Sequence, residues 1–359
     1  MSEKNDEQSG FILWLSQQAL PIRIISFFVF VVLIVGLIIG ATIGLYYVNV
    51  SNFPRLVPFA LDDTVSVYEF AVLEDEEAYP SAIASASDGT AYTGSYISGA
   101  VWQILPNGEV IEMPDTRANI GSVIGIDVAS DGTVYILDHL DPFLAGGAKI
   151  WQINVDGVTL HSEIAERGDI SLLKPNDIVV SDDGLIFVLD ISLGQILTVD
   201  AEGLSIWWQS PDSTYQIAGL AYNALNNSLM ISDAVRTAIY EIPLNAENPE
   251  AERQIVYVDE TTQSPPAFNG LSVGDDGTIY VAAFDLNEVW SIEPNTNTFT
   301  ILANNYRGSS DVAYDSANQR LYVNNWDQSW LIPITLVVIQ VDLPPRLPFS
   351  IDVIELNAE

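Results

Sequence analysis

The residues best suited to chemistry lie in one segment, "DHLDPFLAGGAK", which spans residues 138–149. It holds His139, one of only two histidines in the chain, between Asp138 and Asp141. An imidazole beside carboxylates can bind a metal ion or transfer protons. We therefore consider Asp138, His139 and Asp141 as a metal or acid–base cluster. The alternative is a decorated surface loop with a solvated histidine.

Other catalytic patterns are absent from the sequence. There is no cysteine, which excludes thiolate nucleophiles and thiolate metal sites. No Ser-His-Asp spacing, G-x-S-x-G motif or P-loop occurs. The second histidine, His161, lies in "GVTLHSEIA", which we expect to be a peripheral strand.

The elements that must position these residues form an internal repeat. The stretch "DGTVYILD" at Asp131 has echoes at Asp88, Asp183 and Asp276, and these four turns are separated by 43, 52 and 93 residues. The widest gap holds a further copy, "NNSLMISD", and "NQRLYVNN" is a sixth. Units of four short strands at this period are typical of β-propeller blades.

The sequence therefore predicts an all-β fold, a six-bladed β-propeller. We expect "TVSVYEFAVL" (64–73) and "FSIDVIEL" (349–356) to complete the sixth blade together, because a propeller must avoid an open seam between its first and last blades. One unit departs from the repeat: 13 residues separate Asp138 from Trp151, against seven at the equivalent places in other units. The extra residues form the segment that holds His139.

The repeated polar and aromatic residues have structural interpretations. The Asp-Gly pairs suit tight turns, where glycine supplies positive φ. We expect Trp102, Trp151 and Trp290 to pack blade against blade. A column at the end of each second strand should accept backbone N–H groups from the turn that follows: Ser95, Asp138, Asp190, Asp233, Ala283 and Asn325.

A single apolar helix precedes the propeller. Residues 24–48 carry no charge and can cross a hydrocarbon layer of about 30 Å. We expect a cytoplasmic segment at 1–23, a signal anchor at 24–48, a linker at 49–64 and the propeller at 65–357. This arrangement predicts a single-pass membrane protein with its N-terminus in the cytoplasm and the propeller extracellular or periplasmic.

Glycine spacing and charge suggest which partners to expect. Gly36, Gly40 and Gly44 form two G-x-x-x-G steps, which let two membrane helices approach closely, so we consider a homodimer through this face. The formal net charge of −36 excludes nucleic acid as a partner.

The segment "PNDIVVSDDGLIFVLDISLGQILTVDAEG" (175–203) resembles an NHL repeat. Residues 65–356 as a whole resemble the six-bladed superfamily that includes gluconolactonases of the senescence-marker type and strictosidine-synthase-like proteins. The lactonase branch implies a divalent cation such as Ca²⁺ at the channel mouth, held by a Glu, an Asn and an Asp at the starts of innermost strands.

The asparagine of that pattern matches twice, at Asn176 in "KPND" and Asn269 in "AFNG". Asp177 and Asp311 lie one position out of register, so strand alternation predicts that they point away from Asn176 and Asn269. Two neutral amides are a poor cage for a hard dication. The alternative is that Asn176 and Asn269 bond to the backbone at the channel mouth.

Three functions remain open. The first is a membrane-anchored module that binds or scaffolds a protein or ligand outside the cytoplasm, without enzymatic activity. The second is a metal-dependent lactonase or esterase that uses Asn176, Asn269 and nearby acids. The third is a small-molecule binder whose acidic funnel takes a cationic ligand.

Overall fold

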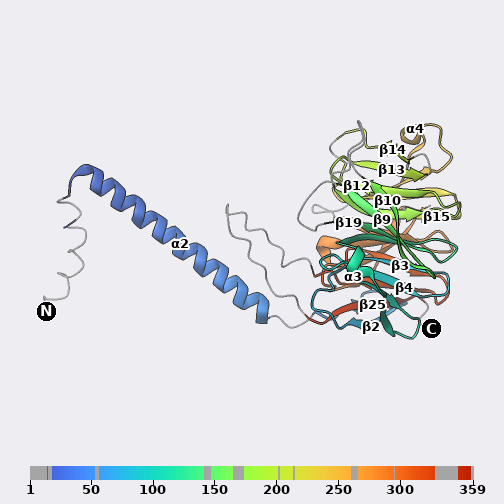
Figure 1. The fold of residues 1–359 in the computed structure, drawn as a ribbon, viewed down its shortest axis with the longest axis horizontal. Helices are drawn as coiled ribbons and strands as arrows, with labels where there is room; N and C mark the ends of the chain where they lie inside the picture. The colour runs from blue at the N-terminus through green and yellow to red at the C-terminus, as the bar shows by residue number, and fades with distance from the viewer. Residues whose placement is uncertain are drawn as a thin grey trace. The chain divides into compact units, whose positions relative to one another are not determined.

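The structure is a computed structural model, and it describes residues 14, 18–52, 56–140, 147–164, 174–200, 203–212, 215–259, 266–294, 296–327 and 347–356. The described residues fall into two units. One is a long N-terminal helix, and the other is a set of six β-sheets (Figure 1).

The helix α2 spans Leu20–Asn52. Its segment Leu20–Leu45 is long and apolar enough to cross a membrane, with a mean hydropathy of 3.1. The span expected at 24–48 lies inside α2, which is consistent with either a signal anchor or a signal peptide. Gly36, Gly40 and Gly44 are exposed, with open space beside each. Helix pairing through them stays a prediction.

The six sheets are the six predicted blades. The short helices between or within them are α3 (Thr116–Asn119), α4 (Pro249–Glu252) and the 3-10 turn η1 (Phe284–Leu286). Blade 1 consists of β3 (Pro80–Ser85), β4 (Ala91–Ser95), β5 (Val101–Ile104) and β6 (Val110–Glu112). Blade 2 consists of β7 (Val123–Val128), β8 (Val134–Asp138), β9 (Ala148–Asn154) and β10 (Gly157–Ile164). Blade 3 consists of β11 (Pro175–Val180), β12 (Ile186–Asp190), β13 (Gln195–Asp200) and β14 (Gly203–Gln209).

The remaining three blades follow in chain order. Blade 4 consists of β15 (Ile217–Asn223), β16 (Ser228–Asp233), β17 (Ala238–Pro243) and β18 (Gln254–Val258). Blade 5 consists of β19 (Phe268–Val273), β20 (Ile279–Ala283), β21 (Glu288–Glu293), β22 (Thr298–Asn304) and the added strand β1 (Phe59–Ala60). Blade 6 consists of β23 (Val312–Asp315), β24 (Arg320–Asn324), β25 (Phe349–Glu355) and β2 (Ser66–Leu73).

The sixth blade closes the ring as predicted. The N-terminal strand β2 pairs antiparallel with the C-terminal strand β25, with Val67 opposite Ile354, and the two lie side by side in Figure 1. Because each terminus supplies part of one sheet, neither end of the ring presents an unpaired edge to the other.

Part of the expected linker is a strand. Phe59 and Ala60 pair with the outer strand of blade 5, and Leu61 N donates to Leu302 O at 2.8 Å. The Asn305 side chain also donates to Val57 O at 2.8 Å. The segment that leads into the propeller is therefore fastened to blade 5 before it enters blade 6.

The core lies between blades. Apolar side chains of adjacent sheets share one cluster, as Phe187 of blade 3 and Tyr240 of blade 4 do. Trp102, Trp151 and Trp290 are buried in such layers, which confirms their packing role. The turn prediction is also confirmed: Asp131 Oδ1 accepts Thr133 N at 2.9 Å, and Gly132 has φ +85°.

Candidate functional site

A channel along the propeller axis joins three spaces. A lower cavity of 490 Å³ opens beside the Asp-Gly turns, and an upper mouth of 230 Å³ opens at the start of the inner strands. Between them is a neck of 20 Å³, room for about one water molecule. Asp177 and Asp311 line both the neck and the lower cavity, and Asn176 and Asn269 line both the neck and the upper mouth.

The structure brings the channel candidates together, against one sequence expectation. Asn176 and Asp177 are consecutive, yet both line the neck, so the prediction that Asp177 points away was wrong. The reason is a register shift between Pro175 and Asp177, which leaves Asn176 as an extra residue opposite β12. Such a bulge breaks the alternation of side chains along a strand. The inner strands of blades 1, 2, 4 and 5 have register shifts near the same level.

The channel carboxylates bond to the next blade. Asp177 Oδ2 accepts Leu220 N of blade 4 at 2.7 Å, and Asp311 Oδ2 accepts Ile83 N of blade 1 at 2.9 Å. A third carboxylate, Asp127, accepts Val180 N of blade 3 at 2.7 Å. The other oxygen of each carboxylate accepts the N–H of the residue that follows it. Neighbouring inner strands belong to different sheets, so these carboxylates supply acceptors that no β-ladder provides there.

A second set of side chains donates across the same seams. Asn176 Nδ2 donates to Ala218 O at 2.6 Å, which confirms the backbone role predicted for Asn176. Ser81 and Ser310 donate from their hydroxyls to carbonyls of the following blade, at 2.6 and 2.7 Å. Ser232 Oγ donates to Asn269 O at 2.7 Å. We call these contacts, together with those of the three aspartates, the seam hydrogen bonds.

The environment of the carboxylates favours their neutral form. Burial raises the pKa of Asp127 and that of Asp311 to about 7. Burial also raises the pKa of Asp177 well above its usual value, and the charge of Asp311 raises it further. The cause in each case is a low-dielectric wall with no basic side chain among the residues that line the lower cavity.

The upper mouth has a different lining. Trp326 lies edge-on to Tyr96, with ring centroids 5.2 Å apart, and Phe284 lies 6.3 Å from Trp326 on another side. His139, Asn176 and Asn269 complete the wall nearest the neck. The described lining contains no carboxylate. The result is an apolar, aromatic recess with amide and imidazole groups at its base.

The predicted cluster at blade 2 divides. Asp138 is buried, and its carboxylate accepts Ser122 N at 2.9 Å, Leu140 N at 2.8 Å and Trp151 Nε1 at 3.0 Å. It therefore has the turn-holding role predicted for its column. His139 is buried as well and faces the upper mouth, whereas Asp141 lies outside the described residues.

The other residues of that column act as predicted, and so does His161. Asp190 Oδ1 accepts Ser192 N at 3.0 Å, and Asp233 Oδ1 accepts Val235 N at 3.1 Å. His161 is exposed on the outer strand β10, where Nδ1 contacts the hydroxyl of Ser162 at 2.7 Å.

The described residues do not fit a calcium site. Ca²⁺ takes about six to eight oxygen ligands, carboxylates among them. No three described His, Asp or Glu side chains are grouped so as to hold a metal ion. Each oxygen of Asp177 and Asp311 already accepts a backbone N–H, and the Asn176 amide is bonded to Ala218 O.

Sequence reasoning missed Asp127 and Trp326. Asp127 lies four residues before the turn at Asp131, where blade 5 has Ser272, and the Ser272 hydroxyl accepts Tyr314 N of blade 6 at 3.0 Å. A polar residue in an otherwise apolar inner strand was the available signal. Trp326 comes just after β24, in a part of the chain that has no equivalent in the other repeats.

The fold is shared with solved enzymes. The structure is similar to that of a gluconolactonase from Xanthomonas campestris, with a TM-score of 0.58 and 14% identity over 84% of this chain and 94% of the other. It is also similar to a catalytically inactive variant of virginiamycin B lyase from Staphylococcus aureus, solved with quinupristin. That match has a TM-score of 0.53 and 16% identity over 81% of this chain and 99% of the lyase.

No family model and no curated protein matches the sequence. At these identities the structural likeness shows the six-bladed propeller fold alone.

Proposed function

We propose that this chain is a membrane-anchored binding module whose ligand occupies the upper mouth. The signal anchor at 24–48 holds it in the membrane with the N-terminus in the cytoplasm, and the propeller at 65–357 is displayed outside. The apolar helix Leu20–Leu45 supports the anchor.

One observation carries the proposal. The polar side chains of the neck form seam hydrogen bonds, while the upper mouth leaves a recess of 230 Å³ with three aromatic rings around it. Concave sites with aromatic walls and a few polar groups are where proteins bind ligands. A metal-dependent lactonase needs oxygen ligands free to hold a cation, and the neck does not supply them.

Site-specific photo-cross-linking of the full chain in its native membranes tests the proposal. A benzophenone amino acid would replace Phe284, which lines the upper mouth, or Tyr222, which lines the lower cavity. We expect a discrete adduct from position 284 that disappears when Trp326→Ala is added, and none from position 222.

Two results would count against the proposal. One is the absence of any adduct from position 284, or the same adduct from both positions. The other is lactone hydrolysis by the purified chain that requires calcium, which would show the enzyme instead of the binding module.

A further inference from the structure

The lower cavity is a second candidate binding site, at the opposite end of the channel from the proposed ligand. Its 490 Å³ lie within the range of about 300–1,000 Å³ that is usual for small-molecule sites. All six blades contribute to its wall, and every lining residue is described. The cavity is thus formed by the rigid inner strands and their short turns.

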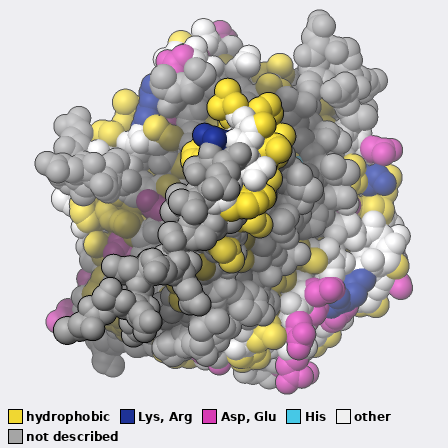
Figure 2. Space-filling model, turned by 90° about the vertical axis from the view of Figure 1, so that its left-hand side faces the viewer, with side chains coloured by type: hydrophobic (Ala, Val, Ile, Leu, Met, Phe, Trp, Pro, Cys, Tyr) yellow, Lys and Arg dark blue, Asp and Glu magenta, His cyan; other side chains and the backbone are white. Residues whose placement is uncertain are grey.

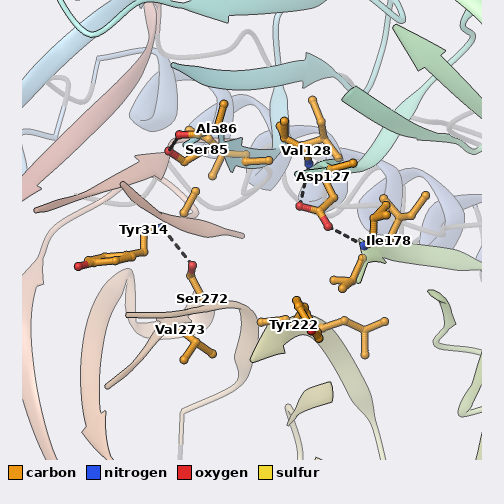
Figure 3. A pocket seen from close by; sticks show the side chains of 18 of the residues that line it. Ser85, Ala86, Asp127, Val128, Ile178, Tyr222, Ser272, Val273 and Tyr314 are labelled. Carbon is orange, nitrogen blue, oxygen red and sulfur yellow. Dashed lines mark hydrogen bonds between the residues drawn. The ribbon is translucent and has the colours of Figure 1, made fainter. Parts of the chain in front are cut away.

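Most of the wall is apolar. Equivalent positions of the inner strands face the cavity with aliphatic side chains, among them Ile126, Ile178 and Leu271. Tyr222 and Tyr314 lie farther out, on opposite sides of the open centre in Figure 3. An apolar part of a ligand would replace water along these strands, which is favourable.

The charged groups are all of one sign. Asp127, Asp177 and Asp311 line the depth of the cavity, Asp182 lies near its turns, and no Lys, Arg or His lines it. Figure 3 shows the Asp127 carboxylate at the edge of the open space. Each carboxylate oxygen that makes a seam hydrogen bond can accept another, because an ionised carboxylate has about four acceptor positions.

The carboxylates lack a neutralising partner in the protein. Burial and mutual repulsion raise the pKa of Asp177, which shows that negative charge is unfavourable there without a cation. A positive charge in the cavity would stabilise the ionised form of all three. The space is far larger than an inorganic ion needs, and its wall offers such an ion few oxygen ligands.

We propose that the lower cavity binds an organic monocation, a primary or quaternary ammonium compound with a compact apolar body. The cationic group would lie against Asp127, Asp177 and Asp311, and the apolar body along the aliphatic wall. The proposal is independent of the ligand of the upper mouth.

Calorimetry on the full chain in lipid nanodiscs can test this directly. The probes are choline, whose charge does not vary with pH, and 3,3-dimethylbutan-1-ol, its uncharged isostere. We expect choline to bind at least about tenfold more tightly at low salt, which corresponds to ~1.4 kcal/mol. Its affinity should fall as salt rises, because the attraction is partly screened.

Matched variants locate the probe. Asp177→Asn and Asp127→Asn keep an acceptor oxygen for the seam hydrogen bond while removing the charge, and either should weaken choline binding about tenfold. Asp276→Asn, in a turn residue outside the cavity lining, and Trp326→Ala, at the upper mouth, should leave it unchanged. If one Asn variant does not fold, the other decides.

Three results would overturn the proposal. They are choline binding that is undetectable or no tighter than that of the isostere, binding unaffected by both Asn substitutions, and binding lost in Trp326→Ala.

Discussion

The upper mouth and the lower cavity are two ends of one channel, and they differ in charge. Four aspartates and no basic side chain line the lower cavity, whereas the described lining of the upper mouth has Lys174 and His139 and no carboxylate. Both ends are walled by the same six inner strands. A repeat fold can therefore present two unlike sites on one axis.

The contrast follows from how each strand begins and ends. At the lower end the inner strands run into short turns that repeat from blade to blade, such as that at Asp131. At the upper end they begin after connections that differ between blades, and Trp326 follows a strand there without an equivalent elsewhere. The acidic surface of the molecule is more general: Figure 2 shows magenta Asp and Glu side chains around the edge of the face it presents.

The strands that both ends share should be the most sensitive part of the molecule. A Cβ at Gly219 would lie 2.5 Å from Asn269 O of the next blade, a backbone atom that cannot yield locally. Gly219→Ala should lower the free energy of unfolding by about 2–3 kcal/mol, measured by urea denaturation. Gly274→Ala, where the closest atom is 3.2 Å away on a side chain, is the control and should cost less. Equal effects would mean that the inner strands are not tightly packed.

The next largest effect should come from the seam hydrogen bonds beside the lower cavity. Asp177→Ala removes the acceptor for Leu220 N and Ile178 N and should lower the free energy of unfolding by about 2 kcal/mol. Asp177→Asn keeps one amide oxygen and should stay within about 1 kcal/mol of the native chain. If both substitutions are equally harmful, the charge of Asp177 stabilises the ring and our account of the seam fails.

The lower cavity should also make stability depend on pH in an unusual direction. The pKa of Asp127 and that of Asp311 are raised to about 7, against an ordinary value of 3.8. Between these values the folded chain keeps protons that the unfolded chain has released, so the free energy of unfolding falls as pH rises from 4 to 7. The slope should be about 1.4 kcal/mol per pH unit for each retained proton.

A variant separates this effect from the general repulsion of an acidic chain. Asp127→Asn should flatten the pH dependence of the unfolding free energy between pH 4 and 7. Asp276→Asn removes a charge outside the channel lining and should leave the slope nearly unchanged. A slope that is the same in both variants and in the native chain would show that Asp127 does not retain its proton.

The sequence predicted the architecture because the repeat is explicit in it. The Asp-Gly turns, the aromatic column of Trp102 and Trp290 and the closing strands 64–73 and 349–356 each follow from local patterns. The placement of Asp177 did not, because the bulge at Asn176 depends on how β11 pairs with β12. The upper mouth was out of reach for a different reason: Tyr96, Phe284 and Trp326 meet only in three dimensions.

The central claim is that the neck of the channel holds the blades together and holds no cation. The most direct test is a calorimetric titration of calcium into the full chain and into an Asn176→Ala, Asn269→Ala variant. We predict no saturable calcium binding in either protein, and a loss of about 1 kcal/mol of stability in the variant as the bond to Ala218 O is removed. Tight calcium binding to the native chain that disappears in the variant would contradict the claim and favour a metal-dependent hydrolase.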